Sequence, residues 1–372
     1  MMGRVYESGL ITISVNLASD ETNWEPLLPH EMPAVGRAPS PQEFWLESML
    51  LGGPLSKRAW CLQERYLSPR ILHVFGNKFW IWECNSRVRG CGYKSQLFRV
   101  DIKNYALPWR KIAFNQYLEL HPDDIIELWD RAVEDYAQRR LSYVTDKLPA
   151  MSGVASKFQQ FFKCKYLAGI WEVDLYGLMW RHKGYWHSDP WPPVVAQEVV
   201  NDPPAYVAPS WSWASNKQPA EIEIPSSQYT RLQRSHCTLL AELTGSNIIT
   251  HDGNVLGQVR ERSHITISGY FWPLKQSGNF DCSIDKNVRA NLDYSRLLVI
   301  GIEYEDKYYP AVYHPTVFGL MLVRLDPASL LFSRVGVFRI DIDDQYVKRS
   351  KRKIDMPKFK TAMGRKREVT IV

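Results

Sequence analysis

The stretch RAWCLQERYLSPRILHVFGNKFWIWEC, residues 58–84, constrains the fold more than any other part of the chain. Its first residues, 59–65, predict a helix, which places Trp60 and Glu64 on one face because residues four apart are neighbours on a helix. Pro69 ends that helix, since the residue before a proline is pushed out of the helical conformation. A short helix with a defined end therefore opens this unit.

Two β-forming runs follow the break. Residues 71–75 and 79–84 are rich in aliphatic and aromatic side chains, and Gly76-Asn77 between them is the signal of a tight turn. We therefore expect the helix to lead into a two-stranded antiparallel hairpin.

Helical patterns dominate the region after the hairpin. Apolar residues at helical spacing predict three helices, which begin at Pro122, near Asp146 and at Tyr166. Elsewhere this half predicts a short helix running into a strand over 1–20, a proline-rich loop over 21–41, a short helix over 44–51 and irregular structure over 85–121. We expect the three helices to pack on each other and to cover a sheet.

The C-terminal half turns to β patterning. Six prolines between 185 and 209 exclude regular structure there. Residues 210–214, Ser-Trp-Ser-Trp-Ala, alternate small residues with tryptophan, as a half-buried strand does. Further strands are predicted at 264–271, 296–302, 309–313, 318–325 and 335–340. The chain as a whole therefore predicts an α+β fold.

The net charge of +6 belongs to the C-terminus and not to a face of the folded chain. Of the 46 basic and 40 acidic residues, ten basic and two acidic ones lie in 345–372, which leaves 36 and 38 elsewhere. We expect this tail to be solvated and disordered. Nucleic acid is therefore not expected as a partner, although the basic cluster 348–353 also has the composition of a nuclear-import signal or of a polyanion contact whose binding would depend steeply on salt.

Cysteine usage and hydropathy indicate a cytoplasmic protein. Six cysteines spread over 372 residues form no disulfide framework, and Cys84 and Cys91 are spaced more widely than the pairs that hold structural zinc. The start carries no secretory leader pattern, and no apolar run approaches the roughly 20 residues of a membrane-spanning helix. Nucleotide-binding glycine motifs and nucleophile elbows do not occur either. We expect no metal, no cofactor and no membrane contact.

Glu64 is the carboxylate to which a chemical role is most readily assigned. Its helix would place it over the Trp60 ring, and an apolar wall of this kind raises the pKa of a carboxyl group by desolvation. The alternative is structural: Glu64 is exposed, or it forms a salt bridge with Arg58, Arg65 or Arg70. On residue type alone, the structural alternative is favoured.

The 58–84 stretch resembles the last block of the fungal heterokaryon-incompatibility (HET) domain. WDRAVEDYAQRRLSYVTDKLPAMSGVA (129–155), YLAGIWEVDLYGLMW (166–180) and APSWSWAS (208–215) resemble the segments downstream of that block in such proteins. Together with the start GRVYESGLITISV (3–15), these stretches cover most of the chain. Their joint occurrence in this order is highly specific to the family.

The resemblance implies a cytosolic protein of self/non-self recognition whose activation leads to growth arrest or programmed cell death, with a protein partner or self-association. HET domains are distantly similar to Toll/interleukin-receptor (TIR) domains, several of which cleave NAD⁺ at the nicotinamide–ribose bond. The catalytic glutamate of plant TIR domains lies in a helix reading roughly W-C-L-x-E-L, and WCLQER (60–65) matches it up to the last position. The resemblance therefore implies a catalytic role for Glu64, whose charge would stabilise an oxocarbenium-like ribose. It implies a binding role for Trp60, Cys61 and Arg65.

The chain departs from the family pattern at its start. A full HET domain begins with an L-S-Y-x-W-G-like strand and has a later D-x-x-C-I-like segment, and neither occurs here. In a parallel α/β domain these strands would be central, and the ligand crevice forms at their carboxyl ends. We therefore expect a truncated gene product or a domain completed in trans, and no NAD⁺ cleavage by this chain alone.

The expected architecture has four parts: a remnant of a TIR-like α/β HET domain over 1–90, a helical region over 91–184, a β-rich region with the SWSWAS motif over 185–344, and the basic tail over 345–372. Two functions of different class are consistent with it. The first is a HET-family death effector that is inactive or incomplete as an NAD⁺-cleaving enzyme. The alternative is a non-catalytic interaction protein that binds its partner through the Trp-rich C-terminal region.

Overall fold

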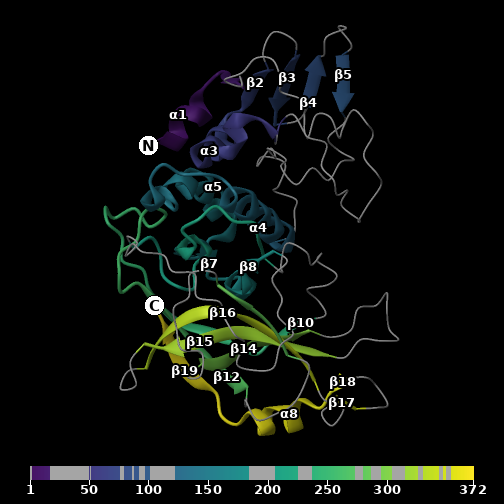
Figure 1. Ribbon diagram of the computed structural model, residues 1–372, viewed down its shortest axis with the longest axis vertical. Coiled ribbons are helices and arrows are strands. Elements are labelled where there is room, and N and C mark those ends of the chain that lie inside the picture. The colour runs from purple at the N-terminus through teal and green to yellow at the C-terminus, as the bar shows by residue number, and fades with distance from the viewer. Residues whose placement is uncertain are drawn as a thin grey trace.

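The computed structural model shows a mixed α+β chain. Along its longest axis, a small N-terminal mixed sheet with helices is followed by a helical segment and then by a large C-terminal sheet (Figure 1). The structure describes residues 2–16, 50, 52–75, 79–85, 88–91, 97–100, 122–183, 206–224, 237–272, 280–285, 295–303, 315–325, 330–342, 347–348 and 353–372. Outside these residues lie the expected loop over 21–41, the Gly76-Asn77 turn, the expected strand over 309–313, nearly all of the expected helix over 44–51 and most of the proline-rich loop over 185–209.

The N-terminal part contains one parallel strand pair. It comprises α1 (Met2–Ser8), β1 (Thr12–Val15), the 3-10 turn η1 (Pro54–Lys57), α3 (Ala59–Leu67), β2 (Arg70–Phe75), β3 (Phe79–Cys84), β4 (Val88–Cys91) and β5 (Leu97–Val100). The sheet has the order β1-β2-β3-β4-β5; β1 is parallel to β2, and the other pairs are antiparallel. The expected helix and strand at the start, the helix before Pro69 and the hairpin after it are confirmed. Because α3 lies in the connection from β1 to β2, these three elements form a β-α-β unit.

The expectation of irregular structure over 85–121 is wrong for β4 and β5. Each of these strands has four residues, which is too short for an alternating pattern to stand out. Each is stabilised by a ladder with its neighbour, since Val88 pairs with Glu83 of β3 and with Val100 of β5. The hairpin is therefore part of a larger, five-stranded mixed sheet.

The helical segment confirms two of the three expected helices. α4 (Pro122–Ala137) begins at the expected proline and buries four residues at helical spacing, Ile126, Trp129, Val133 and Tyr136. The second helix is preceded by two 3-10 turns, η4 (Val144–Asp146) and η5 (Pro149–Met151), before α5 (Ser152–Phe162) begins. The two helices meet edge to face at Trp129 and Phe158, whose ring centroids are 5.2 Å apart.

The third expected helix, over 166–180, is wrong. These residues form a small hairpin, β6 (Tyr166–Leu167) with β7 (Ile170–Trp171), and then the 3-10 turn η6 (Leu175–Met179). Ala168 and Gly169 at the hairpin tip have φ angles of +50° and +107°, which a right-handed helix excludes. Nearly every residue of this segment is buried, so the apolar spacing reflects burial on all sides and not one helix face.

A 3-10 turn, η7 (Trp213–Ser215), replaces the half-buried strand expected over 210–214. Both Trp211 and Trp213 are buried, and the Trp213 indole Nε1 donates to the Gly169 carbonyl at 2.8 Å. The motif therefore packs against the tip of the β6–β7 hairpin from inside the chain. The strand before the motif in sequence, β8 (Arg181–His182), pairs with the strand after it, β9 (Ile222–Glu223).

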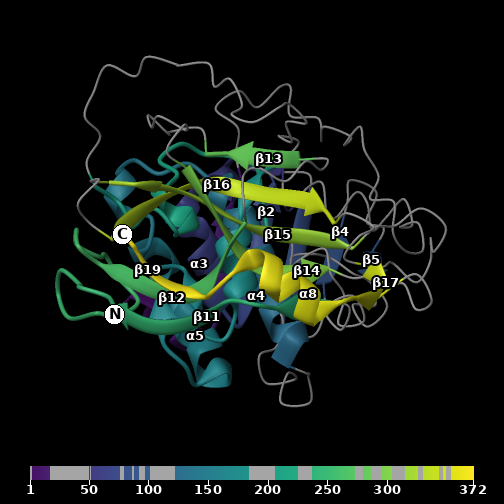
Figure 2. The ribbon, with the colours of Figure 1, turned by 90° about the horizontal axis from the view of Figure 1, so that it is seen from below.

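The C-terminal part is a strongly connected sheet. It comprises β10 (Cys237–Leu239), β11 (Glu242–Asn247), β12 (His264–Trp272), β13 (Phe280–Ile284), β14 (Ser295–Glu303), β15 (Thr316–Arg324), β16 (Leu331–Asp341), α8 (Met356–Met363) and β19 (Arg367–Ile371). The order is β10-β14-β15-β16-β19-β12-β11, and β13 pairs with β16. An additional β12–β14 pairing closes β14, β15, β16, β19 and β12 into a ring. Figure 2 shows β13 and β16 on one side and β12 and β11 on the other. The strands expected within 264–271, 296–302, 318–325 and 335–340 are confirmed.

This sheet has two buried faces. Alternate residues of a strand point to opposite faces, and along β14 Leu298 and Ile300 share a core with Trp180 of the helical segment. Leu297 and Val299, between them, belong to a second core that includes Phe359 of α8. The sheet is therefore covered by the helical segment on one face and by α8 on the other.

The expected disordered tail is wrong for residues 353–372. After a small ladder of β17 (Val347–Lys348) with β18 (Lys353–Ile354), α8 leads into β19, which lies between β16 and β12. Val369 and Ile371 are buried, whereas the basic residues 365–367 are exposed. The charged composition of this segment therefore did not predict the short strand that it contains. No helix in the described part of the chain is long and apolar enough to cross a membrane.

Candidate functional site

All four predicted site residues lie on α3, which contacts α1, α4 and α5 (Figure 1). At its start, the Ala59 N–H donates to the Arg140 carbonyl at 2.9 Å, and the Arg140 N–H donates to the Lys57 carbonyl at 2.7 Å. Further along, the buried Gln63 side-chain oxygen accepts from the Gly153 N–H at 2.8 Å. The helix is therefore anchored to the helical segment at two levels.

Trp60 and Cys61 are both half-buried near the start of α3. The Trp60 indole Nε1 donates to Asp146 Oδ2 at 3.2 Å, which ties the ring to η4. Burial raises the pKa of the Cys61 thiol, and the nearby Glu64 carboxylate raises it further. Cys61 is therefore a protonated and weakly nucleophilic thiol at neutral pH.

Glu64 lies half-buried on α3, near Tyr6 of α1. Burial, together with the Glu64 carboxylate beside it, raises the pKa of Tyr6 to about 12. A protonated Tyr6 is thus able to donate a hydrogen bond to the Glu64 side chain. Within the described residues, no ion pair joins Glu64 to Arg58, Arg65 or Arg70, so the salt-bridge alternative is not what the structure shows.

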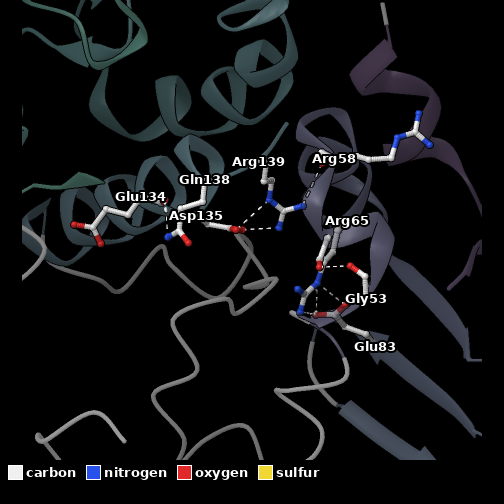
Figure 3. A network of polar contacts seen from close by, with 9 residues as sticks. Gly53, Arg58, Arg65, Glu83, Glu134, Asp135, Gln138 and Arg139 are labelled. Carbon is white, nitrogen blue, oxygen red and sulfur yellow. Dashed lines mark hydrogen bonds and ion pairs between the residues drawn. The ribbon is translucent and has the colours of Figure 1, made fainter. Parts of the chain in front are cut away.

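Arg65 points to the sheet instead and pairs with Glu83 of β3 (Figure 3). Its Nε donates to Glu83 Oε2 at 2.9 Å, and its Nη2 donates to Oε1 at 2.9 Å, which is the bidentate geometry of a strong pair. His73 Nε2 of β2 lies 2.9 Å from the same Oε2. Burial by itself would raise the pKa of Glu83, but Arg65 and His73 outweigh it and hold this pKa well below its ordinary value. This buried triad joins α3 to two strands.

A second buried ion pair joins Asp135 of α4 to Arg139, which lies just after the end of this helix. Arg139 Nε donates to Asp135 Oδ1 at 3.0 Å and its Nη2 to Oδ2 at 2.7 Å, and Arg139 Nη1 reaches the Arg58 carbonyl at 3.4 Å (Figure 3). Burial raises the pKa of Tyr66, with the Asp135 carboxylate as the next largest cause. Burial lowers the pKa of Arg65, but Glu83 and Asp135 raise it by more. The two ion pairs therefore act on one another electrostatically across the boundary between the N-terminal sheet and the helical segment.

Sequence reasoning missed His73, Glu83, Asp135 and Arg139. The last two stand four apart on a predicted helix, and that spacing is a visible signal of an ion pair. Glu83 gives no such signal, because its partner Arg65 is 18 residues away and is reached only through the packing of α3 on the sheet. The structure thus assigns Arg65 a structural contact and leaves Glu64 beside two neutral, protonated groups.

Metal-binding and disulfide chemistry find little support in the described residues. Among them, no group of three or more His, Cys, Asp and Glu is placed to hold a metal ion. No disulfide joins any two of the cysteines whose side chains are described, which are Cys61, Cys84, Cys164, Cys237 and Cys282. The groups that lie beside the Glu64 carboxylate on α3 are the Tyr6 phenol and the Cys61 thiol.

Comparison of the chain with protein-family models, with curated proteins and with solved structures finds no match in any of the three. Its function is therefore inferred from the sequence motifs and from the geometry around α3.

Proposed function

We propose that the chain is a HET-family protein of fungal non-self recognition and programmed cell death, which acts in the cytoplasm through assembly with a protein partner. The observation that carries this proposal is the position of WCLQER on the helix between two parallel strands, β1 and β2. TIR-like α/β domains are built from such units. The N-terminal part is, on this proposal, the remnant of a TIR-like domain.

The surroundings of Glu64 support descent from an NAD⁺-cleaving site more than present activity. A half-buried carboxylate beside a protonated phenol suits the stabilisation of a cationic ribose. However, a ligand crevice in an open α/β sheet forms at the carboxyl ends of neighbouring parallel strands. In the described N-terminal sheet, β1 and β2 are the only parallel pair. Arg65, which the resemblance assigns to binding, is bound to Glu83.

The second candidate is a non-catalytic interaction protein that uses the Trp-rich C-terminal region. Trp211 and Trp213 are buried in the chain's own core, so the SWSWAS motif would have to leave that core to reach a partner. This observation favours the N-terminal part as the partner-binding region. The basic cluster 348–353, which lies mostly outside the described residues, keeps nuclear import as an additional proposal.

The purified chain is expected to leave NAD⁺ intact, because the described N-terminal sheet offers a single parallel strand pair on which a crevice facing Glu64 could form. Nicotinamide release, followed by chromatography beside an active TIR domain as positive control, measures this directly. Glu64→Ala is expected to behave like the wild type, and Glu127→Ala on the surface of α4 serves as the matched carboxylate control. NAD⁺ consumption by the wild type that is abolished by Glu64→Ala but retained by Glu127→Ala would contradict the proposal.

A further inference from the structure

The outer edge of β1 has no strand partner among the described residues. In the described part of the sheet, β2 is its only strand neighbour. The Asn16 N–H donates to the Val74 carbonyl of β2 at 2.8 Å. Because successive residues of a strand direct their N–H and C=O groups to opposite sides, Ile11, Ile13 and Val15 direct theirs away from β2. These groups are a template for one more strand.

The side chains of this edge are apolar and exposed. Ile13 is 63% and Val15 is 48% exposed, and Leu10 and Ile11 are exposed as well. Natural edge strands are commonly protected by charged residues, proline or bulges. No charged residue or proline occurs over 9–16, and the β1–β2 register runs without interruption.

The edge strand β11 of the C-terminal sheet provides a contrast within the same chain. It begins with Glu242, and its register with β12 shifts between Leu243 and Gly245. A charge and an irregularity are two of the devices that prevent a strand from pairing with another chain. Among the described residues, the β11 edge is therefore protected, whereas the β1 edge is left open.

We propose that β1 pairs antiparallel with β1 of a second copy of this chain, about a two-fold axis at Ile13. In this register Ile13 faces its own copy, Ile11 faces Val15, and Thr12 faces Ser14. Aliphatic side chains then meet aliphatic ones and hydroxyls meet hydroxyls, as a self-complementary two-fold contact requires. Since neither copy brings a charge to the strand, no like charges are opposed. This inference rests on the assembly in the proposed function and names its partner as a second copy.

Sedimentation velocity of the purified full chain over a concentration series tests the contact. The wild type is expected to dimerise. Ile13→Lys is expected to raise the dissociation constant of the dimer at least about tenfold, because two like charges meet on the axis. Ile13→Pro removes only an outward-facing N–H and is expected to have the same effect, since proline is tolerated on the free side of an edge strand. Val255→Lys, at an aliphatic residue that is 55% exposed and lies between β11 and β12 of the C-terminal sheet, is the matched control and is expected to dimerise as the wild type does.

Cross-linking tests the register. A hydrogen-bonded antiparallel pair has Cα atoms about 5.5 Å apart, within the range of a disulfide. I13C is therefore expected to form a covalent dimer under mild oxidation. V15C is expected to form none, because it faces Ile11 of the other copy and not a cysteine. The wild type, run in parallel, accounts for the native cysteines. Equal cross-linking of I13C and V15C would overturn the proposed register.

A wild type that stays monomeric across the series would overturn the inference, and so would a dimer that Ile13→Lys and Val255→Lys affect equally. Circular dichroism of each variant establishes that it is folded. Failure of this inference is distinguishable from failure of the proposed function. A monomer that arrests fungal growth would contradict the contact alone, whereas a dimer without any effect on growth would contradict the function.

Discussion

Glu83→Gln is expected to lower the free energy of unfolding by about 3–5 kcal/mol at neutral pH, because removing one partner of a buried ion pair leaves the other charge uncompensated. The Glu83 side chain is 3% exposed and accepts from both Arg65 and His73. Urea denaturation measures the difference. The control is Glu127→Gln, which breaks a more exposed pair with Arg131 and is expected to cost less than about 1 kcal/mol. Equal costs for the two variants would show that the triad does not stabilise the fold.

The contribution of Glu83 is expected to depend on pH. Its pKa is lower in the folded chain than in the unfolded one, where a glutamate titrates near about 4.3. The unfolded state therefore binds the proton first as the pH falls, and the stabilisation is complete above the unfolded pKa and decreases below it. The difference in unfolding free energy between wild type and Glu83→Gln should therefore shrink as the pH falls below about 4. A difference that is the same at pH 5 and at pH 3 would contradict the lowered pKa of Glu83.

Trp213→Ala is expected to lower the free energy of unfolding by about 3–5 kcal/mol, as for other large aromatic side chains removed from a packed core. The ring packs edge to face on Tyr136 at 5.7 Å between centroids, and its Nε1 donates to the Gly169 carbonyl at 2.8 Å. Lys147 Nζ lies 6.0 Å from the ring centroid, and burial lowers the pKa of this lysine to about 8. The loss therefore combines a cavity, an unpaired carbonyl and a buried cation without its aromatic neighbour.

The matched control is Trp80→Ala on β3, where the side chain is 38% exposed and much less packing is lost. Urea unfolding of both variants, followed by far-ultraviolet circular dichroism, gives the comparison. Equal destabilisation by Trp80→Ala and Trp213→Ala would show that the SWSWAS motif is not a core element, and would return it to consideration as a partner-binding surface.

Local chemistry made α3, the following hairpin and α4 predictable. Pro69 and Pro122 mark one helix end and one helix start, and those marks need no knowledge of tertiary structure. The hairpin over 166–171 was not predictable in the same way, because Ala168 and Gly169 take positive φ angles inside a segment that is buried on all sides. β19 was missed since a run of exposed charged residues precedes its two buried aliphatic ones. In these cases tertiary packing overrode the local pattern.

At the candidate site, too, local features were predictable from the sequence and contacts made by tertiary packing were not. The WCLQER motif placed Glu64 on a helix correctly, since helical spacing is a local property. The neighbour of Glu64 is Tyr6, far away in sequence, and the pairing of Arg65 with Glu83 depends on how α3 packs on the sheet. Neither contact leaves a mark in the spacing of residues, so the division of roles between Glu64 and Arg65 required the structure.

Growth of a filamentous fungus that expresses the chain from an inducible promoter tests the central claim most directly: that this is a cell-death protein acting through assembly and not through NAD⁺ cleavage of its own. Wild type, Glu64→Ala and Val255→Lys are predicted to arrest growth at equal expression, whereas Ile13→Lys is predicted to permit it. Normal growth with the wild type, or arrest that Glu64→Ala abolishes and Ile13→Lys retains, would contradict the account.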